Sequence, residues 1–486
     1  MPTQPIPFVN DQKSGDQELA GASTLAINVV TDGAGTVRRR PGISAWSGFP
    51  SSIPEATAVI GMHAFEGKLI FINEGTRQIR RLVPTTQAVQ NLSTGGGSSY
   101  LLGTQRPTFA ETQFRLVMTG GGIPTKLDAT SLACAALGGS PPPSTHILGL
   151  AGRLVSNDTT EAVTINQFAF SDSGAAGNET WSGLNTGSYS VEAQPDPLVA
   201  LLSNSNELFT FGSRSLQVWQ PAFQVTIFDS RVLFDPGRAL NRGCSAPYSI
   251  VEADESFSWL DEKRRFLSSN GRGIEDISAA LGRTLDNITT VDDCFGFRWL
   301  ADQYDVLCWI FPSDGRSFAI QSGGGWAQWH SWTDGQGYSA LPITSHYYWP
   351  ELNLQLVGLS SGQIAKLDST AQDDLGATIK AEVRTGFLDR GTGAHKHCQA
   401  VRFFFRRGHT SSSTVAPQVL LSWRDTLGDF TTPIRLNLGV ASDYVFSVEK
   451  RSLGTYRSRQ WRLEFTDAVD FVLAKAEETF TVGGQN

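Results

Sequence analysis

The serine motif at residues 358–362 is the first pattern in the sequence that suggests chemistry. Gly358-Leu-Ser-Ser-Gly362 fits the G-x-S-x-G pattern of a nucleophile elbow. Such an elbow leads from a buried strand through a strained turn into a helix. The residues that follow here, 363–368, have the pattern of a strand instead. The motif therefore indicates a hairpin turn and not a catalytic serine.

Histidines and carboxylates offer two further patterns. His395 and His397 fall on one face of an expected strand, and with a third ligand they would bind a metal ion. No second His/Cys cluster lies near them in the sequence, which favours a polar strand start. Asp292 and Asp293 are adjacent, so they point to different sides of a strand and do not form the facing pair that glycoside hydrolysis needs. The sequence predicts no catalytic, cofactor-binding or metal-binding residue, and we expect no enzyme activity.

Arginines form the remaining candidate site. The densest basic run is Arg38-Arg39-Arg40, directly before Pro41-Gly42. It is either a contact for phosphate or an acidic partner, or a solvated strand end, and three adjacent arginines cannot all face one side of a strand. We group Arg406 and Arg407 with this run as possible partner-facing or DNA-facing residues.

Charge limits the partners. The net charge of −8 and the pI near 5.5 argue against a non-specific nucleic-acid binder, which needs a basic face. A protein that encloses DNA without gripping it is still allowed, because a channel wall along which DNA slides should be neutral or acidic.

Cysteine usage and the start of the chain indicate the compartment. Five widely spaced cysteines without a C-x-x-C motif favour a reducing compartment over a disulfide framework. They are Cys134, Cys244, Cys294, Cys308 and Cys398. The first residues have no secretory signal pattern, and no apolar run approaches the length of a membrane span.

The elements that would position these residues are mostly hairpins. Residues 206–220 alternate polar and apolar side chains on both sides of a Gly-Ser-Arg-Ser turn, which predicts a tight β-hairpin. Similar hairpins recur, and their leading strands start at residues 68, 114, 153, 207, 257, 306 and 354. A period of about 40–50 residues is typical of the four-stranded blades of a β-propeller. The alternative is a large β-sandwich or two barrels.

The spacing of the predicted hairpins divides the chain into three parts. We predict an all-β protein with an N-terminal arm or closing strand at residues 1–45, a six- or seven-bladed β-propeller-like domain at 46–370 and a C-terminal β-sandwich at 371–486. A strand such as 25–30 would complete one blade and close the ring. Apolar residues at helical spacing predict one helix at 274–288, packed on a blade edge.

Three blocks of residues follow one another along the chain. They are Asn28 with Gly35 and Arg40-Pro41-Gly42-Ile43; Ala193-Gln194-Pro195-Asp196 with Phe211-Gly212-Ser213 and Ser215-Leu216-Gln217; and Asp302 with Tyr304-Asp305, Trp326 and Trp329. In this order they resemble the packaged-DNA stabilisation or tail hub proteins of short-tailed (podovirus) phages. The resemblance covers about the first 370 residues, and the C-terminal part matches more loosely through residues 456–465. The segments 134–144 and 171–181 depart from the family pattern.

The resemblance implies a structural protein of the virion tail, assembled in the host cytoplasm. Proteins of this family form a six-fold ring below the portal and its adaptor ring, extend the DNA channel, help to retain packaged DNA, and hold tail fibres, spikes or a needle. The alternative is a β-propeller glycosidase or carbohydrate-binding protein. Residues 171–181 resemble a degenerate Asp box of sialidase-like propellers, but in that motif the residues pin a blade turn and do not catalyse. A glycan hydrolysis screen would separate the two.

Overall fold

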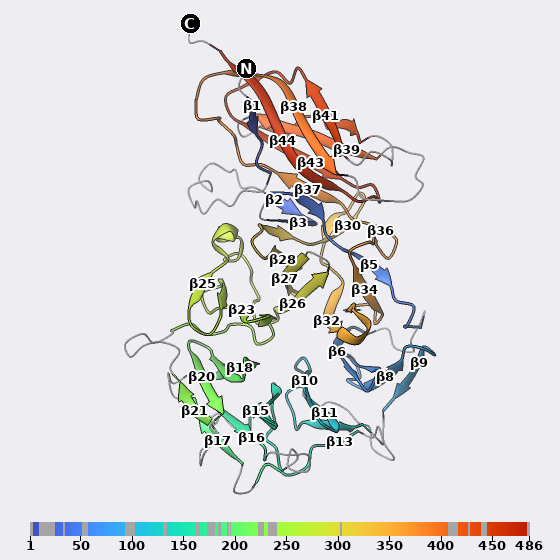
Figure 1. The fold of residues 1–486 in the computed structure, drawn as a ribbon, viewed down its shortest axis with the longest axis vertical. Helices are drawn as coiled ribbons and strands as arrows, with labels where there is room; N and C mark the ends of the chain where they lie inside the picture. Colours follow the sequence, from blue (N-terminus) through green and yellow to red (C-terminus); the bar gives the residue numbers. More distant parts are fainter. Residues whose placement is uncertain are drawn as a thin grey trace.

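The computed structural model describes most of the 486 residues, and strands make up nearly all of its regular structure (Figure 1). The described residues are 3–8, 25–32, 35–50, 57–92, 103–129, 134–160, 166–172, 180–182, 186–191, 194, 196–221, 228–231, 241–301, 304–406, 417–425, 428–438 and 445–483.

Six antiparallel units of four strands follow one another along the chain, and each is made of consecutive strands. They are arranged around a common centre in the lower part of Figure 1. The units are β6 (Val59–Phe65), β7 (Lys68–Asn73), β8 (Ile79–Val83) and β9 (Ala88–Asn91); β10 (Thr108–Thr112), β11 (Arg115–Thr119), β12 (Thr125–Asp128) and β13 (Cys134–Ala136); β14 (Ile147–Leu150), β15 (Arg153–Asn157), β16 (Gln167–Phe170) and β17 (Gly187–Ser190); β18 (Leu198–Asn204), β19 (Glu207–Gly212), β20 (Leu216–Pro221) and β21 (Phe228–Arg231); β22 (Val251–Ala253), β23 (Ser256–Leu260), β24 (Phe266–Ser269) and β25 (Ile274–Asp276); and β26 (Phe295–Ala301), β27 (Tyr304–Phe311), β28 (Arg316–Gln321) and β29 (Trp326–Gln328).

A further unit closes the ring with a strand from the N-terminal part of the chain. β32 (Ile343–Trp349), β33 (Leu354–Leu359) and β34 (Ile364–Asp368) are completed by β5 (Gly42–Ala45), which runs antiparallel to β34. The prediction of a closing strand at 25–30 is wrong, because β2 (Leu25–Ile27) and β3 (Val29–Thr31) pair with other strands. The propeller itself is confirmed.

The predicted hairpins occupy the second and third strands of the seven units. In the hairpin of β19 and β20, Leu208 lies opposite Trp219 and Phe211 opposite Leu216, as the alternation predicts. The first and second strands of several units are joined by tight turns. Between β6 and β7, Glu66 and Gly67 both have positive φ, 50° and 67°, as the preferred two-residue hairpin turn requires.

Aromatic side chains fill the space between neighbouring units. Phe211 of β19 contacts Trp259 of β23 edge to face, at 5.5 Å between ring centroids. Phe266 of β24 stacks on Trp309 of β27 at 4.4 Å. Because each sheet is covered on both faces by its neighbours, the units stabilise one another, as in radially stacked propeller blades.

The C-terminal domain is a β-sandwich of two sheets, above the propeller in Figure 1. The N-terminal segment contributes strands to both sheets. One sheet has the order β3, β4 (Val37–Arg39), β44 (Val472–Val482), β38 (Lys396–Arg406) and β41 (Val445–Arg451), with β1 (Thr3–Pro5) on β44 and β42 (Thr455–Tyr456) on β38; the other has the order β2, β37 (Ala381–Arg384), β43 (Arg459–Phe465), β39 (Gln418–Asp425) and β40 (Ile434–Asn437).

One sheet runs through both domains. β29, the last strand of a propeller unit, pairs with β2 in parallel, and β2 pairs with β37 of the sandwich, so nine strands form a continuous sheet. The core is continuous as well, because Val306 and Ile343 of the propeller belong to the same buried cluster as Phe403 and Trp461 of the sandwich. Two small hairpins lie beside this connection: β30 (Ser331–Thr333) with β31 (Gly337–Ser339), and β35 (Asp373–Asp374) with β36 (Ala377–Thr378).

The predicted helix at 274–288 is wrong in type. The segment starts with strand β25 and continues as a short 3₁₀ segment, η3 (Ala279–Thr284), interrupted at Gly282 with φ 50° and ψ −130°. Its apolar residues Leu281, Leu285 and Ile288 are nevertheless buried against the propeller. Another 3₁₀ turn, η4 (Pro350–Leu352), joins β32 to β33. Among the described residues, no helix is long and apolar enough to span a bilayer.

Candidate functional site

Arg40 lies at the junction between the two domains and uses all five of its N–H groups within the chain. Its Nη atoms donate to the two oxygens of Asp374, at 3.0 and 2.5 Å. Nε donates to Asn28 Oδ1 at 3.0 Å, and the main-chain oxygens of Pro41 and His330 accept at 2.8 and 3.1 Å. The Arg40 side chain is 1% exposed and that of Asp374 is 9% exposed. This buried pair therefore joins the N-terminal segment to the chain that follows the propeller.

Arg39 is also buried, and it faces the sandwich. It donates to the main-chain oxygens of Asp467 and Val469, at 2.7 and 2.5 Å, and to the Gln372 side chain. Its guanidinium carbon lies 5.3 Å from the centroid of the Phe465 ring. Burial lowers the pKa of Arg39 to about 10, and the nearby Asp470 opposes this shift. Arg39 therefore holds the 465–470 segment against the segment that follows the propeller.

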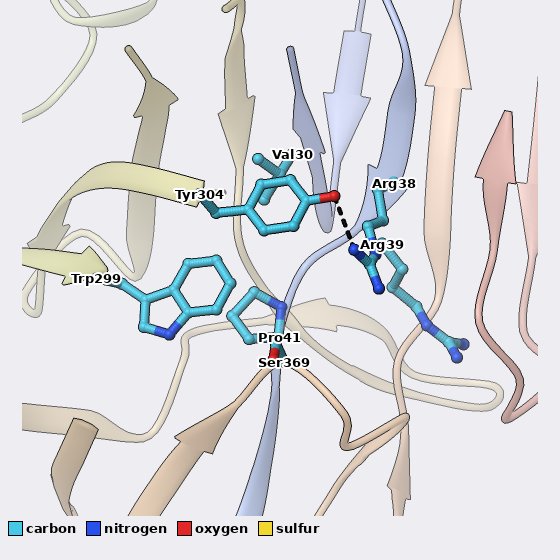
Figure 2. A pocket seen from close by; sticks show the side chains of 7 residues that line it. All are labelled: Val30, Arg38, Arg39, Pro41, Trp299, Tyr304 and Ser369. Atoms are coloured by element: carbon cyan, nitrogen blue, oxygen red, sulfur yellow. Dashed lines mark hydrogen bonds between the residues drawn. The ribbon is translucent and has the colours of Figure 1, made fainter. Parts of the chain in front are cut away.

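Arg38 connects the sandwich to the propeller. It donates to both carboxylate oxygens of Asp470, at 3.3 Å each. It also donates to the hydroxyl of Tyr304 on β27, at 2.8 Å (Figure 2). Burial would lower the pKa of Arg38, but the hydrogen bonds to Tyr304 and Asp470 outweigh burial and raise it. The three arginines thus make three separate links across one junction.

A small recess opens beside these arginines. Figure 2 shows it between the arginine segment and the aromatic rings of Trp299 and Tyr304, which stack at 6.0 Å. Its cavity volume of about 10 Å³ is roughly what one water molecule needs, so the recess is too small for a small-molecule ligand. The recess is lined by Val30, Arg38, Arg39, Pro41, Trp299, Tyr304 and Ser369.

The predicted positions of the arginines need correction. Arg39 and Arg40 are 5% and 2% exposed. The prediction that they face a partner or DNA is therefore wrong about their exposure, because both side chains are buried within the chain. Arg38 is partly exposed and already paired. Arg406 is exposed at the end of β38, as that prediction requires, and Arg407 lies outside the described residues.

The sequence interpretation missed the carboxylates that neutralise this run. Asp374 lies in the segment 369–376, which reads only as a polar junction, and Asp470 follows the last arginine-rich strand. Three arginines next to a Pro-Gly turn require counter-charges if they are buried. That requirement is the signal that would have directed attention to Asp374.

The other chemical motifs fall on structural positions. Residues 358–362 form the turn between β33 and β34, as predicted, with Gly362 N donating to Leu359 O at 3.0 Å. His395 and His397 are exposed, and no cluster of three metal-binding side chains occurs among the residues that the structure describes. Asp293 accepts from the Ser313 main-chain nitrogen at 2.7 Å.

The cysteines are all buried and free. Burial raises the pKa of Cys134 and Cys244 to about 12, and it raises the pKa of the other three as well. A thiol with a raised pKa is a poor nucleophile at neutral pH. The cysteines therefore act as small core residues.

The blocks that carry the family resemblance also lie in the scaffold. Asp196 accepts from the Arg214 main-chain nitrogen at 2.6 Å and from Ser215 Oγ at 2.9 Å, so it fixes the turn between β19 and β20. A side chain at Gly212 would place its Cβ 2.4 Å from Asp196 Oδ2. Trp329 Nε1 donates to Val29 O at 3.1 Å, between the propeller and the N-terminal segment.

Comparisons with known proteins give only distant similarity. The sequence matches no protein-family model, and the search of curated proteins gives no match. Among solved structures, the chain is similar to the N-terminal domain of Nup159 (10% identity, 71% of this chain and 99% of that chain, TM-score 0.39), to BamB from Moraxella catarrhalis (10%, 75% and 97%, 0.36) and to an exo-beta-1,3-galactanase from Phanerochaete chrysosporium (8%, 91% and 100%, 0.28).

Proposed function

We propose that this protein is a structural subunit of a phage tail: a hub that docks below the portal and adaptor ring, extends the DNA channel, helps to retain packaged DNA and anchors fibres, spikes or a needle. The observation that carries the proposal is the continuous nine-stranded sheet from the propeller into the sandwich. A subunit that bears the load of packaged DNA must not bend between its domains. A shared sheet and a shared core give that stiffness, because bending there would break strand pairing.

The arginine links support the same role. Arg38, Arg39 and Arg40 occupy the junction with contacts inside the chain, on both sides of the domain boundary. Buried hydrogen-bonded contacts on both sides of a boundary favour one relative orientation of the two bodies, because any other orientation would leave these polar groups without partners. A fixed orientation is what a subunit needs to close a ring with identical copies.

The DNA channel would be the centre of the ring of subunits and not the propeller axis, since Arg106 of one unit contacts two other units of the propeller. Arg106, just before β10, reaches across to donate to the main-chain oxygen of Thr344 on β32. Its guanidinium lies 3.9 Å from the centroid of the Phe295 ring on β26. The net charge of −8 is compatible with a channel wall that does not hold DNA.

Exposed apolar side chains offer a place for contact between subunits. Leu300, Tyr348 and Leu352 are 42%, 37% and 48% exposed, and they lie at the ends of β26 and β32 and in η4. Gln355 donates to Leu300 O at 2.8 Å, so these residues belong to one surface of two adjacent units. Grouped exposed apolar residues are a feature of interaction surfaces.

Electron microscopy tests the proposal. We expect the purified protein, mixed with the adaptor ring of its particle, to form rings, and we expect Leu352→Asp to weaken them, whereas Ile123→Asp, at an exposed apolar residue in a loop of another unit, should not. Protein that stays monomeric in the presence of the adaptor would contradict the proposal. Hydrolysis in a glycan screen that a single Asp or Glu substitution abolishes would support the enzyme alternative instead.

A further inference from the structure

The first strands of the propeller units surround its axis. Neighbouring first strands are in contact: β32 with β6, β10 with β14, β14 with β18 and β22 with β26. Since these strands begin at the same end of the axis, the residues just before them gather there. We call this end the axial mouth and define it by Arg77, Arg106, Tyr248 and Phe295.

Each member reaches the axial mouth from a different unit. Arg106 precedes β10, Tyr248 precedes β22, and Phe295 begins β26. Arg77 lies in the turn after β7, which returns to this end because β7 is antiparallel to β6. Its Nη2 donates to the main-chain oxygen of Gln105, next to Arg106 in the chain. Tyr248 and Phe295 are joined by a β-bridge.

The polar groups of the axial mouth are short of partners. Arg106 makes one hydrogen bond, to Thr344 O at 2.5 Å, and among the described residues neither Arg106 nor Arg77 has a carboxylate within ion-pair distance. The Tyr248 hydroxyl and Arg77 Nε are buried, and neither has a hydrogen-bond partner in the part of the chain that the structure describes. The Tyr248 ring is held in place by stacking on His146, at 5.2 Å and 18° between planes.

The nearest charges do not neutralise the two guanidiniums. Burial lowers the pKa of Arg106 to about 10, and the opposing effects of Tyr248, Glu74 and Asp293 are smaller. Glu74 is exposed. One oxygen of Asp293 accepts from Ser313 N, and the other is buried without a partner. The pKa of His146 is lowered to about 4 by burial, so this ring adds no positive charge at neutral pH.

Arg77 and Arg106 are half-buried, and each donates a hydrogen bond to a main-chain oxygen but meets no anion among the described residues. Taking such charges partly out of water costs free energy, and so does burying a hydroxyl that donates to nothing. Two guanidiniums and a phenol hydroxyl can each donate to one oxyanion, and guanidinium forks match the geometry of carboxylates and phosphates. We propose that the axial mouth binds a single small oxyanion of the carboxylate or phosphate class, with Arg77, Arg106 and the Tyr248 hydroxyl as donors. This inference is independent of the tail-hub proposal.

Calorimetric titration of the full chain with inorganic phosphate and with acetate, at constant ionic strength in chloride, tests the inference. We expect saturable 1:1 binding of at least one of the two anions. Binding of phosphate would indicate that the natural ligand carries a phosphate group, and binding of acetate would indicate a carboxylate. Tyr248→Phe should weaken this binding at least tenfold without lowering the melting temperature in chloride, because the ring stack on His146 is kept. Arg106→Gln should weaken it by at least as much.

The controls make the result decisive. Arg272→Gln, at an exposed arginine in the turn between β24 and β25, should bind as the unaltered protein does. Should Arg106→Gln fail to fold, Tyr248→Phe decides alone. The inference is overturned if neither anion binds, if Tyr248→Phe binds with unchanged affinity, or if Arg272→Gln loses binding equally.

Discussion

Replacing Asp374 by asparagine removes the charge that neutralises Arg40 and keeps the size of the side chain. Asp374 accepts from both Nη atoms of Arg40 and from the Ile43 main-chain nitrogen at 3.1 Å. An asparagine has one acceptor oxygen, and its NH₂ group would face an arginine donor or the Ile43 amide. Both members of the pair are buried, and removing one partner of a buried pair destabilises by about 3–5 kcal/mol. We therefore expect the unfolding equilibrium to change by about a hundredfold or more.

Urea unfolding followed by tryptophan fluorescence measures this effect. The control is Asp254→Asn, which breaks another two-oxygen pair, with Arg298 at 2.8 and 3.0 Å. Asp254 is 78% exposed, and Arg298 keeps Asp305 as a partner, so we expect no measurable change. Equal stability of Asp374→Asn and the unaltered chain would refute the reasoning that the Arg40 pair holds the junction.

Further predictions concern packing, pH and thiol access. Gly212→Ala should destabilise by about 1–3 kcal/mol, since its Cβ would lie 2.4 Å from Asp196 Oδ2, whereas Gly273→Ala, with nothing within 4 Å, should be neutral in the same urea assay. Burial lowers the pKa of His346 to about 4, below its usual 6.5, so the unfolded chain binds more protons and stability should fall as pH drops from 6.5 towards 4, by up to about 3 kcal/mol. His346→Phe should reduce this dependence but not abolish it, because burial also lowers the pKa of His146 to about 4; an unchanged pH profile would contradict the prediction. All five cysteines should resist a thiol reagent in the folded protein and react in urea; rapid labelling without urea would show that the thiols are accessible.

The sequence predicts the second and third strands of each unit better than the closure of the ring. Hairpins such as β19 and β20 are local, because the turn and the alternation lie within 15 residues. Closure depends on a partner more than 300 residues away, and a strand of four residues such as β5 carries little pattern. The segment at 25–30 is more apolar than β5, but it forms parts of two strands: β2, which pairs with β29 and β37, and β3, which pairs with β4.

The errors at the arginines and at η3 have a related origin. A basic run in a sequence suggests exposed side chains when no counter-charge lies near it in the sequence. Here the counter-charges, Asp374 for Arg40 and Asp470 for Arg38, lie more than 300 residues away. In the segment 274–288, the apolar spacing correctly indicates which residues are buried. Gly282 adopts a backbone conformation outside the helical region, so the side chains reach the core from a 3₁₀ segment and not from a helix.

The N-terminal segment couples the closure of the propeller ring to the junction between the two domains, because it contributes strands to both. β2 must pair with β37 of the sandwich, and β5, which follows β3 and β4 in the chain, must pair with β34 of the propeller, while Arg40, just before β5, holds Asp374. If β5 leaves the propeller, the Ile43 main-chain bond to Asp374 is lost as well. Pairing strands this far apart in the sequence costs more chain entropy than closing a local hairpin does. Weakening the Arg40 pair should therefore shift the unfolding of both domains together, in one transition, and two separated transitions for Asp374→Asn would show that the domains are stabilised independently.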